Sequence, residues 1–376
     1  MQSVYLIGRS AISALGTTVE DHFQKASHAQ TGLAACTDER FSPHPFWASR
    51  IPEEVVQHIQ QQYNASGALT AFETLGIAAA DAALKDAGIT AAQEDTIFIL
   101  SSTKGNISEL GKRPDAQISL HYSALQIQKY FQTAHPVMVV SNACVSGSAA
   151  QMMAKRMLEG GLYQQAVVIG CDLLSGFVLD GFSGFHAISP EACRPFDKDR
   201  KGINLGEAAA CMVFSIHPQN SRLQLSGAAA SNDANHLSGP SRTGEELAQA
   251  IRKAMNEAKV EATTIGAISA HGTATLYNDE MESKALQTAG LNSIPLHSLK
   301  SFVGHTLGAA GVLESVVAVE AMAQQVLLPS LNVSEPGVTG KVYILNNAQA
   351  AKYSILVKTA SGFGGCNTAL VWQYLS

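Results

Sequence analysis

The chain has 376 residues, of which 46% are hydrophobic and 15% are charged, and its formal net charge is −6. This length suits one large or two medium domains. The acidic balance excludes a nucleic-acid-binding protein that relies on a broad basic face. No run of 18 apolar residues occurs, so membrane insertion is not expected. The first residues lack a basic leader and a long apolar core, which favours a strand over a signal peptide.

The chain contains six cysteines, but none forms a Cys-x-x-Cys pair and their spacings follow no pattern. Neither a disulfide framework nor a metal site is therefore indicated. Reduced thiols in a cytoplasmic protein are the expected state.

Apolar strands and amphipathic helices alternate along the chain. In the first half, strands are predicted over 4–8, 96–101, 137–140, 165–170 and 206–214, and helices over 18–26, 70–88, 118–131 and 146–159. Residues 30–66 are predicted to be surface structure, and residues 176–192 are predicted to be a loop. In the second half, strands are predicted over 223–229, 265–270, 295–299 and 353–358, and helices over 244–258, 279–288 and 306–324.

The ends of the strands fall in the same order in the two halves. The loops after 97–100, 137–140 and 166–170 correspond in turn to those after 265–270, 295–299 and 353–358. This order indicates an internal duplication joined near residues 215–222, with an N-terminal half over 1–217 and a C-terminal half over 218–376. Alternating strands and helices predict an α/β fold, which places its ligands at the ends of strands.

Cys144 lies between a predicted strand and a predicted helix. The β-branched run at 137–140 stops at Ser141 and Asn142, and small residues at 146–150 begin the helix. Unpaired N–H groups and the macrodipole at a helix N-terminus stabilise a thiolate. This position makes Cys144 a candidate nucleophile, and the small residues should let the helix begin close to its neighbours.

Two histidines in glycine-flanked loops are candidate partners for this thiol. His271 and His305 each follow an apolar strand, where the backbone must turn sharply or be approached closely. Lys300 and Glu314 lie on either side of His305 in sequence, and the Gly-Phe-Gly-Gly segment at 362–365 can present backbone N–H groups. A cysteine nucleophile needs a base or a positive neighbour and an oxyanion site. The residues alone leave open that the histidines are structural and that the cysteine is a core residue.

Six segments, in this order along the chain, resemble motifs of the β-ketoacyl-acyl carrier protein synthases of the thiolase-like superfamily, in particular the chain-elongating branch. They are Asn-Ala-Cys-Val-Ser-Gly at 142–147, Arg-Pro-Phe-Asp-Lys-Asp-Arg-Lys-Gly at 194–202, Leu-Gly-Glu-Ala at 205–208, His-Gly-Thr-Ala-Thr-Leu-Tyr-Asn-Asp at 271–279, Lys-Ser-Phe-Val-Gly-His-Thr-Leu-Gly-Ala-Ala-Gly at 300–311 and Gly-Phe-Gly-Gly-Cys-Asn at 362–367. The resemblance implies a thiolase-like fold whose two pseudo-symmetric halves form a layered α-β-α-β-α core.

The same resemblance implies a decarboxylative Claisen condensation in fatty acid or type II polyketide synthesis, aryl-polyene synthesis included. Cys144 would take an acyl chain from a phosphopantetheine thioester. Malonyl-acyl carrier protein would then lose CO2 and attack the acyl-enzyme as an enolate, giving a β-ketoacyl-acyl carrier protein. No metal or other cofactor is implied, because decarboxylation supplies the driving force and the substrates are carried on phosphopantetheine.

The motifs also imply roles for individual residues. The backbone N–H groups of Cys144 and Phe363 resemble an oxyanion hole, and neutral His271 and His305 would donate to the malonyl thioester oxygen. Lys300 and Glu314 match a pair that would fix the histidine tautomer, and Thr273 and Thr275 match positions beside the pantetheine arm. Phe363 matches a gate between the malonyl and acyl sites, and Phe182 matches a wall of the acyl pocket. Lys112 and Arg113 match a basic pair that would dock the carrier protein.

Basic residues that the family often places near its pocket mouth are sparse in this chain. Residues 60–67 contain none, and His186 stands where an arginine is common. With a net charge of −6, docking of an acidic carrier protein cannot rest on global attraction. The basic patch is therefore either small or completed by a partner subunit, in a homodimer or in a heterodimer with a chain-length factor.

Three other functions fit parts of the same pattern. A non-catalytic chain-length factor usually lacks the nucleophile, whereas Cys144, His271, Lys300 and His305 are all present here. A thiolase would use a second cysteine in its C-terminal loop, and Cys366 lies near that loop but is expected to be a core residue. A starter-unit synthase would carry asparagine in place of His271. An elongating ketosynthase is the favoured hypothesis, with chain length and pathway left open.

Overall fold

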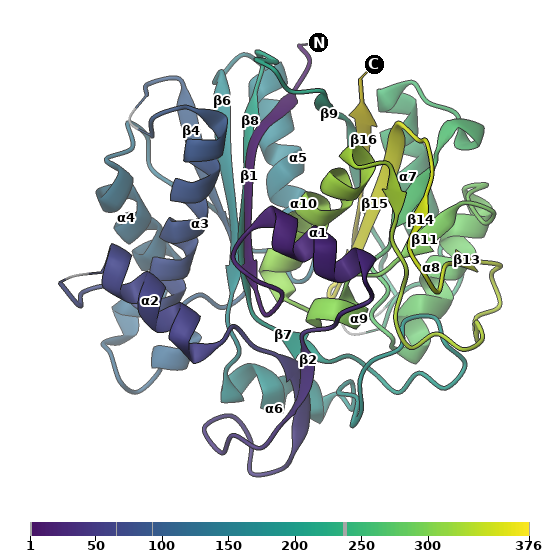
Figure 1. The fold of residues 1–376 in the computed structure, drawn as a ribbon, viewed down its shortest axis with the longest axis horizontal. Coiled ribbons are helices and arrows are strands. Elements are labelled where there is room, and N and C mark those ends of the chain that lie inside the picture. Colours follow the sequence, from purple (N-terminus) through teal and green to yellow (C-terminus); the bar gives the residue numbers. More distant parts are fainter. Residues whose placement is uncertain (1, 65, 92, 236–238, 376) are drawn as a thin grey trace.

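The computed structural model describes residues 2–64, 66–91, 93–235 and 239–375. These residues form a central sheet of eleven strands (Figure 1). The strands of the first half are β1 (Tyr5–Ser13), β4 (Thr96–Ser101), β5 (Met138–Val140), β6 (Gln165–Asp172) and β8 (Ala208–Ser215). Those of the second half are β9 (Leu223–Asn232), β10 (Ala267–Ser269), β11 (Pro295–His297), β13 (Tyr343–Ile344), β15 (Ile355–Gly362) and β16 (Cys366–Tyr374).

The order of the strands shows the internal duplication. In the first half the order is β5-β4-β6-β8-β1, with parallel pairs at β4 and antiparallel pairs after β6. The second half repeats this pattern as β11-β10-β15-β16-β9. The predicted correspondence of strand ends is correct, because β10, β11 and β15 take the places of β4, β5 and β6. The halves meet where Tyr5 of β1 pairs with Gln224 of β9.

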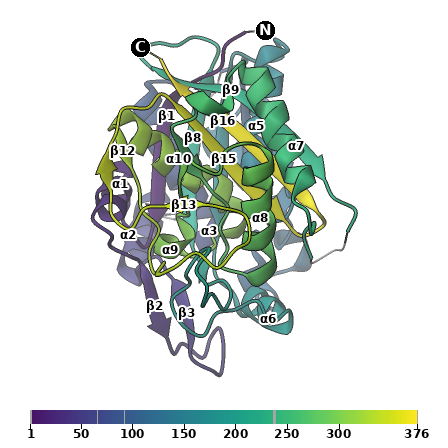
Figure 2. The same cartoon turned by 90° about the vertical axis from the view of Figure 1, so that its right-hand side faces the viewer.

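Helices lie outside and between the two halves of the sheet (Figures 1 and 2). The outer layers contain α3 (Ala71–Ala87) and α4 (Leu120–Phe131) on the first half, and α7 (Glu245–Ala258) and α8 (Leu276–Thr288) on the second. Between the halves, α5 (Ser146–Glu159) and α10 (Ala310–Ala323) contact strands of both. This is the predicted α-β-α-β-α layering. Among the described residues, no helix has the length and apolar character needed to span a membrane.

The two inner helices approach each other at glycines. Nearly every residue of α10 is buried, as expected for a helix that is apolar on all sides. A Cβ atom at Gly311 would lie 2.3 Å from the backbone nitrogen of Ser148, and one at Gly147 would lie 2.7 Å from the backbone nitrogen of Val312. Small residues are therefore required where α5 and α10 cross, which confirms the expectation for residues 146–150.

Two segments are more regular than the sequence predicts. Residues 30–66 contain β2 (Leu33–Cys36), β3 (Phe46–Ser49) and α2 (Glu53–Tyr63), and β3 pairs with β7 (Leu205–Gly206). The predicted loop over 176–192 contains α6 (Gly176–Gly184). Ser175 caps α6, and the buried side chains of Val178 and Leu179 hold it in place, so packing and capping outweigh its three glycines.

The remaining elements are short, apart from one strand that the sequence analysis missed. β16 follows the Gly-Phe-Gly-Gly segment and pairs with both β9 and β15, so it is a central strand of the second half. The other elements are α1 (Val19–Ser27), α9 (Lys300–Val303), β12 (Val326–Leu327), β14 (Gln349–Ala350) and the 3-10 turns Ile107–Glu109, Asp115–Gln117, Ala262–Thr264 and Leu307–Ala309.

Gly311→Ala is expected to destabilise the protein, because the added methyl group would overlap the backbone of α5. Overpacking of this kind typically costs about 1–3 kcal/mol. Gly181→Ala in α6 is the matched control, since a Cβ atom there meets nothing within 4 Å. Urea unfolding gives the free energy of unfolding of both variants, and an unchanged value for Gly311→Ala would contradict the tight crossing.

Candidate active site

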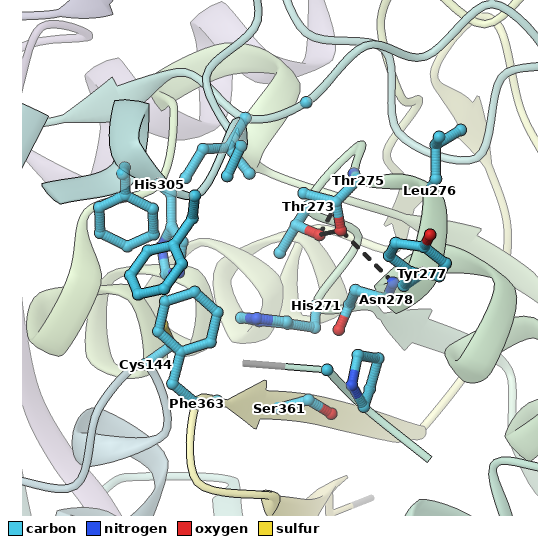
Figure 3. A pocket seen from close by; sticks show the side chains of 18 of the residues that line it. Cys144, His271, Thr273, Thr275, Leu276, Tyr277, Asn278, His305, Ser361 and Phe363 are labelled. Atoms are coloured by element: carbon cyan, nitrogen blue, oxygen red, sulfur yellow. Dashed lines mark hydrogen bonds between the residues drawn. The ribbon is translucent and has the colours of Figure 1, made fainter. Parts of the chain in front are cut away.

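Residues from both halves of the sheet line a pocket of about 350 Å³ (Figure 3). Figure 3 shows Cys144, His271 and His305 facing the same space, with Phe363 beside the cysteine. The structure thus brings together most of the predicted site residues: Cys144, Phe182, His271, Thr273, Thr275, His305 and Phe363 line the pocket. Lys300 and Glu314 lie behind the histidines, where both are buried.

Cys144 occupies a strained turn between β5 and α5. The preceding Ala143 has a φ of +44°, in the left-handed region that non-glycine residues seldom adopt. The Ser146 hydroxyl fixes the turn, because it accepts from the Asn142 N–H at 2.8 Å and donates to the Ala143 carbonyl at 2.6 Å. The sulfur is thereby held at the pocket wall, with the side chain buried.

The thiol of Cys144 differs from the sequence-based expectation of a stabilised thiolate. Burial raises the pKa of Cys144 to about 11, and the positive charge of Lys300 and a hydrogen bond from the backbone of Phe363 offset this only in part. Desolvation penalises the charged form of a buried thiol. The sulfur therefore carries its proton at neutral pH.

Lys300 fixes the tautomer of His271. Its Nζ lies 3.2 Å from His271 Nδ1, and it donates to the His271 carbonyl at 2.8 Å and to Glu314 Oε1 at 2.5 Å. An ammonium group can only donate, so Nδ1 must accept and the ring proton sits on Nε2. The imidazole of His271 therefore presents an N–H donor on its other edge.

His305 has the same tautomer for a different reason. The backbone N–H of Leu307 donates to its Nδ1 at 3.2 Å, which again places the ring proton on Nε2. Within the described part of the chain, this buried Nε2 has no hydrogen-bond partner. The preceding Gly304 has a φ of +63°, and a Cβ there would lie 2.6 Å from the carbonyl oxygen of Leu205. The close backbone approach predicted for this loop is therefore present.

The two imidazole rings meet edge to face, with centroids 5.3 Å apart and planes at 84°. Burial, with a further contribution from the nearby positive charge of Lys300, holds the pKa of both His271 and His305 well below the usual value. Both rings are therefore neutral at physiological pH. Two neutral N–H donors beside one sulfur can stabilise negative charge on an oxygen bound between them.

Glu314 forms an ion pair with a second lysine, Lys358, which is not among the predicted site residues. Lys358 Nζ lies 2.7 Å from Glu314 Oε2, while Lys300 occupies the other carboxylate oxygen. The available signal is the placement of Lys358 inside an apolar strand, directly after Ile355, Leu356 and Val357. A charged residue in such a strand requires a buried partner.

Aromatic side chains form one wall of the pocket. Phe363 is 37% exposed; its ring stacks on Phe182 with centroids 5.7 Å apart, and the edge of Phe185 packs against it at 5.3 Å. On the opposite side, the hydroxyls of Thr273 and Thr275 lie 2.9 Å apart and face the pocket (Figure 3). The pocket is therefore apolar near Phe363 and polar near the threonines.

The predicted docking pair lies away from the pocket lining. Lys112 donates to the Ser108 carbonyl at 2.9 Å, and Arg113 pairs with Glu109 at 3.6 Å. Among the described lining residues, Lys201 is the sole lysine or arginine. The motif at 194–202 does not predict that Lys201 lines the pocket. His186, which stands where the family often has an arginine, also lines the pocket. The rim includes the exposed Leu276 and Tyr277.

Cys366 is not the core residue that the sequence analysis expects. It is partly exposed, and its thiol lies 3.1 Å from Asn142 Oδ1 and 3.3 Å from Asn232 Oδ1. Cys366 is the first residue of β16 and is only partly buried, whereas the six residues that follow it in the strand are all buried. It does not line the pocket that contains Cys144.

Comparison with known protein families shows that this chain matches two domains of one family. The N-terminal domain of the beta-ketoacyl synthases matches residues 1–217, and their C-terminal domain matches residues 223–334. The chain belongs to the beta-ketoacyl synthase family. This result confirms the family that the six motifs predict.

Individual relatives agree with this assignment. The chain is 31% identical to a putative polyketide beta-ketoacyl synthase 1 of Streptomyces cyaneus, over 78% of this chain and 80% of the relative. It is 28% identical to 3-oxoacyl-[acyl-carrier-protein] synthase 2 of Vibrio cholerae, over 98% of both chains. Its fold matches a structure of a ketosynthase in complex with its chain length factor from Xenorhabdus doucetiae, with a TM-score of 0.84, 26% identity, and coverage of 99% of this chain and 98% of that chain.

Alkylation of Cys144 by iodoacetamide is expected to accelerate about tenfold per pH unit from pH 7 to pH 10, because a raised thiol pKa leaves little thiolate at neutral pH. Lys300→Met should slow the reaction further, since it removes a charge that lowers the pKa of Cys144. Peptide mapping by mass spectrometry separates Cys144 from the partly exposed Cys36 and Cys366. A rate that is already constant above pH 7 would show that the pKa is not raised.

Proposed function

We propose that the pocket catalyses the decarboxylative condensation of an acyl chain on Cys144 with malonyl-acyl carrier protein, giving a β-ketoacyl-acyl carrier protein. The observation that carries this proposal is that two histidines, each with its proton on Nε2, face the same cavity as the cysteine sulfur. A thiol nucleophile and two neutral donors suit a reaction that places negative charge on thioester oxygens. Family membership agrees with this chemistry.

In the first step, the Cys144 sulfur forms a bond to the carbonyl carbon of the acyl thioester, and the bond from that carbon to the pantetheine sulfur breaks. The thiol proton leaves on the pantetheine sulfur, so no proton is gained or lost. The backbone N–H groups of Cys144 and Phe363 would hold the carbonyl oxygen while it carries negative charge.

In the second step, the malonyl group loses CO2, and the electron pair of the broken carbon–carbon bond forms an enolate. His271 and His305 would donate from Nε2 to the enolate oxygen, and Lys300 with Glu314 would keep His271 in the donating tautomer. The enolate carbon then bonds to the acyl carbonyl carbon, and the bond from that carbon to Cys144 breaks. The negative charge of the malonyl carboxylate ends on the sulfur, which takes one proton from solvent.

The rest of the pocket suits a pantetheine-linked chain. Thr273 and Thr275 would bind the pantetheine arm, Phe182 would contact the acyl chain, and Phe363 would separate the acyl and malonyl sites. In this proposal the enzyme needs no resident cofactor or metal, since the pantetheine belongs to the carrier protein. Lys112 and Arg113 would dock that acidic protein, with Lys201 at the rim. A cytoplasmic location would suit the free cysteines.

Cys144→Ala is expected to abolish the acyl adduct, whereas His271→Ala and His305→Ala should keep the adduct and lower condensation roughly 100- to 1,000-fold each. Intact-protein mass and CO2 release from malonyl-acyl carrier protein measure the two steps separately. His28→Ala, on the surface and outside the pocket lining, is the control. Condensation that survives Cys144→Ala would refute the mechanism, and a wild-type chain that forms no adduct would favour a chain-length factor.

The exposed edge of the sheet supports a proposed dimer. β5 is the last strand of its half, its outer backbone groups have no neighbouring strand in the sheet as described, and Val139 on it is 37% exposed. Unprotected edge strands readily pair with another chain. We propose that a second ketosynthase-fold chain, either identical or a chain-length factor, pairs with this edge.

Val139→Lys is expected to shift the protein from dimer to monomer, because the charge would be buried where the two edges meet. Sedimentation velocity measures the change, with Leu162→Lys at another exposed apolar site as the control. A wild-type chain that is monomeric alone but dimeric with a coexpressed chain-length factor would select the heterodimer. A Val139→Lys variant that stays dimeric would rule out this edge.

A further inference from the structure

Lys358 is a fully buried lysine in the interior of β15. It pairs with Ser269 of β10 on one side and Leu370 of β16 on the other, and its side chain is 0% exposed. A buried ammonium group is unfavourable unless it is paired and hydrogen-bonded. A lysine in this position therefore needs a reason beyond packing, since an aliphatic residue would fill the space without that penalty.

The partners of Lys358 connect it to the histidines. Its Nζ lies 2.7 Å from Glu314 Oε2 and donates to the Thr359 carbonyl at 2.5 Å. The other oxygen of Glu314 is held by Lys300, which contacts His271 Nδ1. One carboxylate is thus held from opposite oxygens by two ammonium groups, and one of these fixes the ring of His271.

The charged groups that act on Lys358 come from three helices. Glu314 lies on α10, Lys300 on α9 and Glu282 on α8. The carboxylate of Glu282 accepts hydrogen bonds from the Thr359 hydroxyl at 2.6 Å and from the backbone N–H groups of His271 and Gly272 at 2.8 Å each. His297 on β11 is also buried, and the charge of Lys358 lowers its pKa further after burial. The same charge contributes to the lowered pKa of His271 and of His305.

We propose that Lys358 is a positioning residue for the condensation: it holds Glu314 opposite Lys300, and Glu314 in turn keeps the Lys300 ammonium against Nδ1 of His271. The inference rests on the proposed function of the pocket. A proton on Nδ1 of His271 would point at the ammonium of Lys300, and one on Nδ1 of His305 would point at the Leu307 N–H. Protonation would therefore disrupt the arrangement that presents both Nε2–H groups to the substrate.

Lys358→Met is expected to move the acidic limb of malonyl-acyl carrier protein decarboxylation upward by about one pH unit, because removal of a nearby positive charge lets the histidines protonate at higher pH. Because both histidines are expected to stay neutral down to pH 5, this limb lies below that pH, and the shift corresponds to a roughly tenfold loss of kcat only at a pH below both midpoints. Acylation of Cys144, followed by intact mass, should change much less. Lys358→Arg, which keeps the charge, should restore the wild-type profile.

Lys155→Met is the matched control. Lys155 is also a buried lysine between two carboxylates, Glu159 and Glu257, but in the described part of the chain these carboxylates pair with Lys155 and Arg156 and with neither Lys300 nor a histidine. Lys155→Met should lower the stability of the protein without moving the pH profile of malonyl-acyl carrier protein decarboxylation. A Lys358→Met enzyme that is folded and has the wild-type acidic limb would overturn the inference. Wild-type protein that forms the acyl adduct but releases no CO2 would instead count against the proposed function.

Histidine side-chain NMR provides a test that needs no activity and no stable variant. In the wild-type protein, His271 and His305 should both show the Nε2–H tautomer and should not titrate between pH 8 and pH 5. Spectra of His271→Ala and His305→Ala assign their signals. A midpoint near the ordinary histidine pKa of about 6.5 in the wild-type protein would overturn the inference even if Lys358→Met does not fold.

Discussion

The close crossing of α5 and α10 determines where the reacting groups lie. Gly147 follows Cys144 by three residues, and Gly311 precedes Glu314 by three residues, so the contact between these glycines places the sulfur and the carboxylate on either side of one junction. A larger residue at either glycine would push the helices apart. Because each helix contacts strands of both halves, such a shift would also separate Cys144 from the histidines.

Burial has opposite consequences for the acidic and the basic groups of the pocket. It raises the pKa of Cys144 to about 11 and lowers the pKa of His271 and His305. A neutral thiol and neutral imidazoles then share one cavity, with the positive charge held behind them on Lys300. Neutral donors suit a site that must stabilise an enolate without protonating it, since an imidazolium would be a stronger acid toward the enolate carbon.

Sequence patterns predict the duplicated α/β fold and the residues at the ends of its strands, because apolar runs, glycines and small residues are local signals. Cys144, His271 and His305 stand out for this reason. α6 is missed because its glycines suggest a loop, while its stability comes from a cap and from burial of Val178 and Leu179. The partner of Lys358 and the raised pKa of Cys144 depend on distances between elements, which one sequence does not specify.

The two halves of the duplicated fold have diverged at equivalent strand positions beside α10. In the first half, Gly170 of β6 pairs with the last residue of β4, and a Cβ there would lie 2.8 Å from the Val312 side chain. In the second half, Lys358 of β15 pairs with the last residue of β10 and contacts Glu314. The first half therefore provides space for α10 and the sulfur, and the second half provides the charges. One inner helix serves both purposes, which explains why neither half would form the pocket alone.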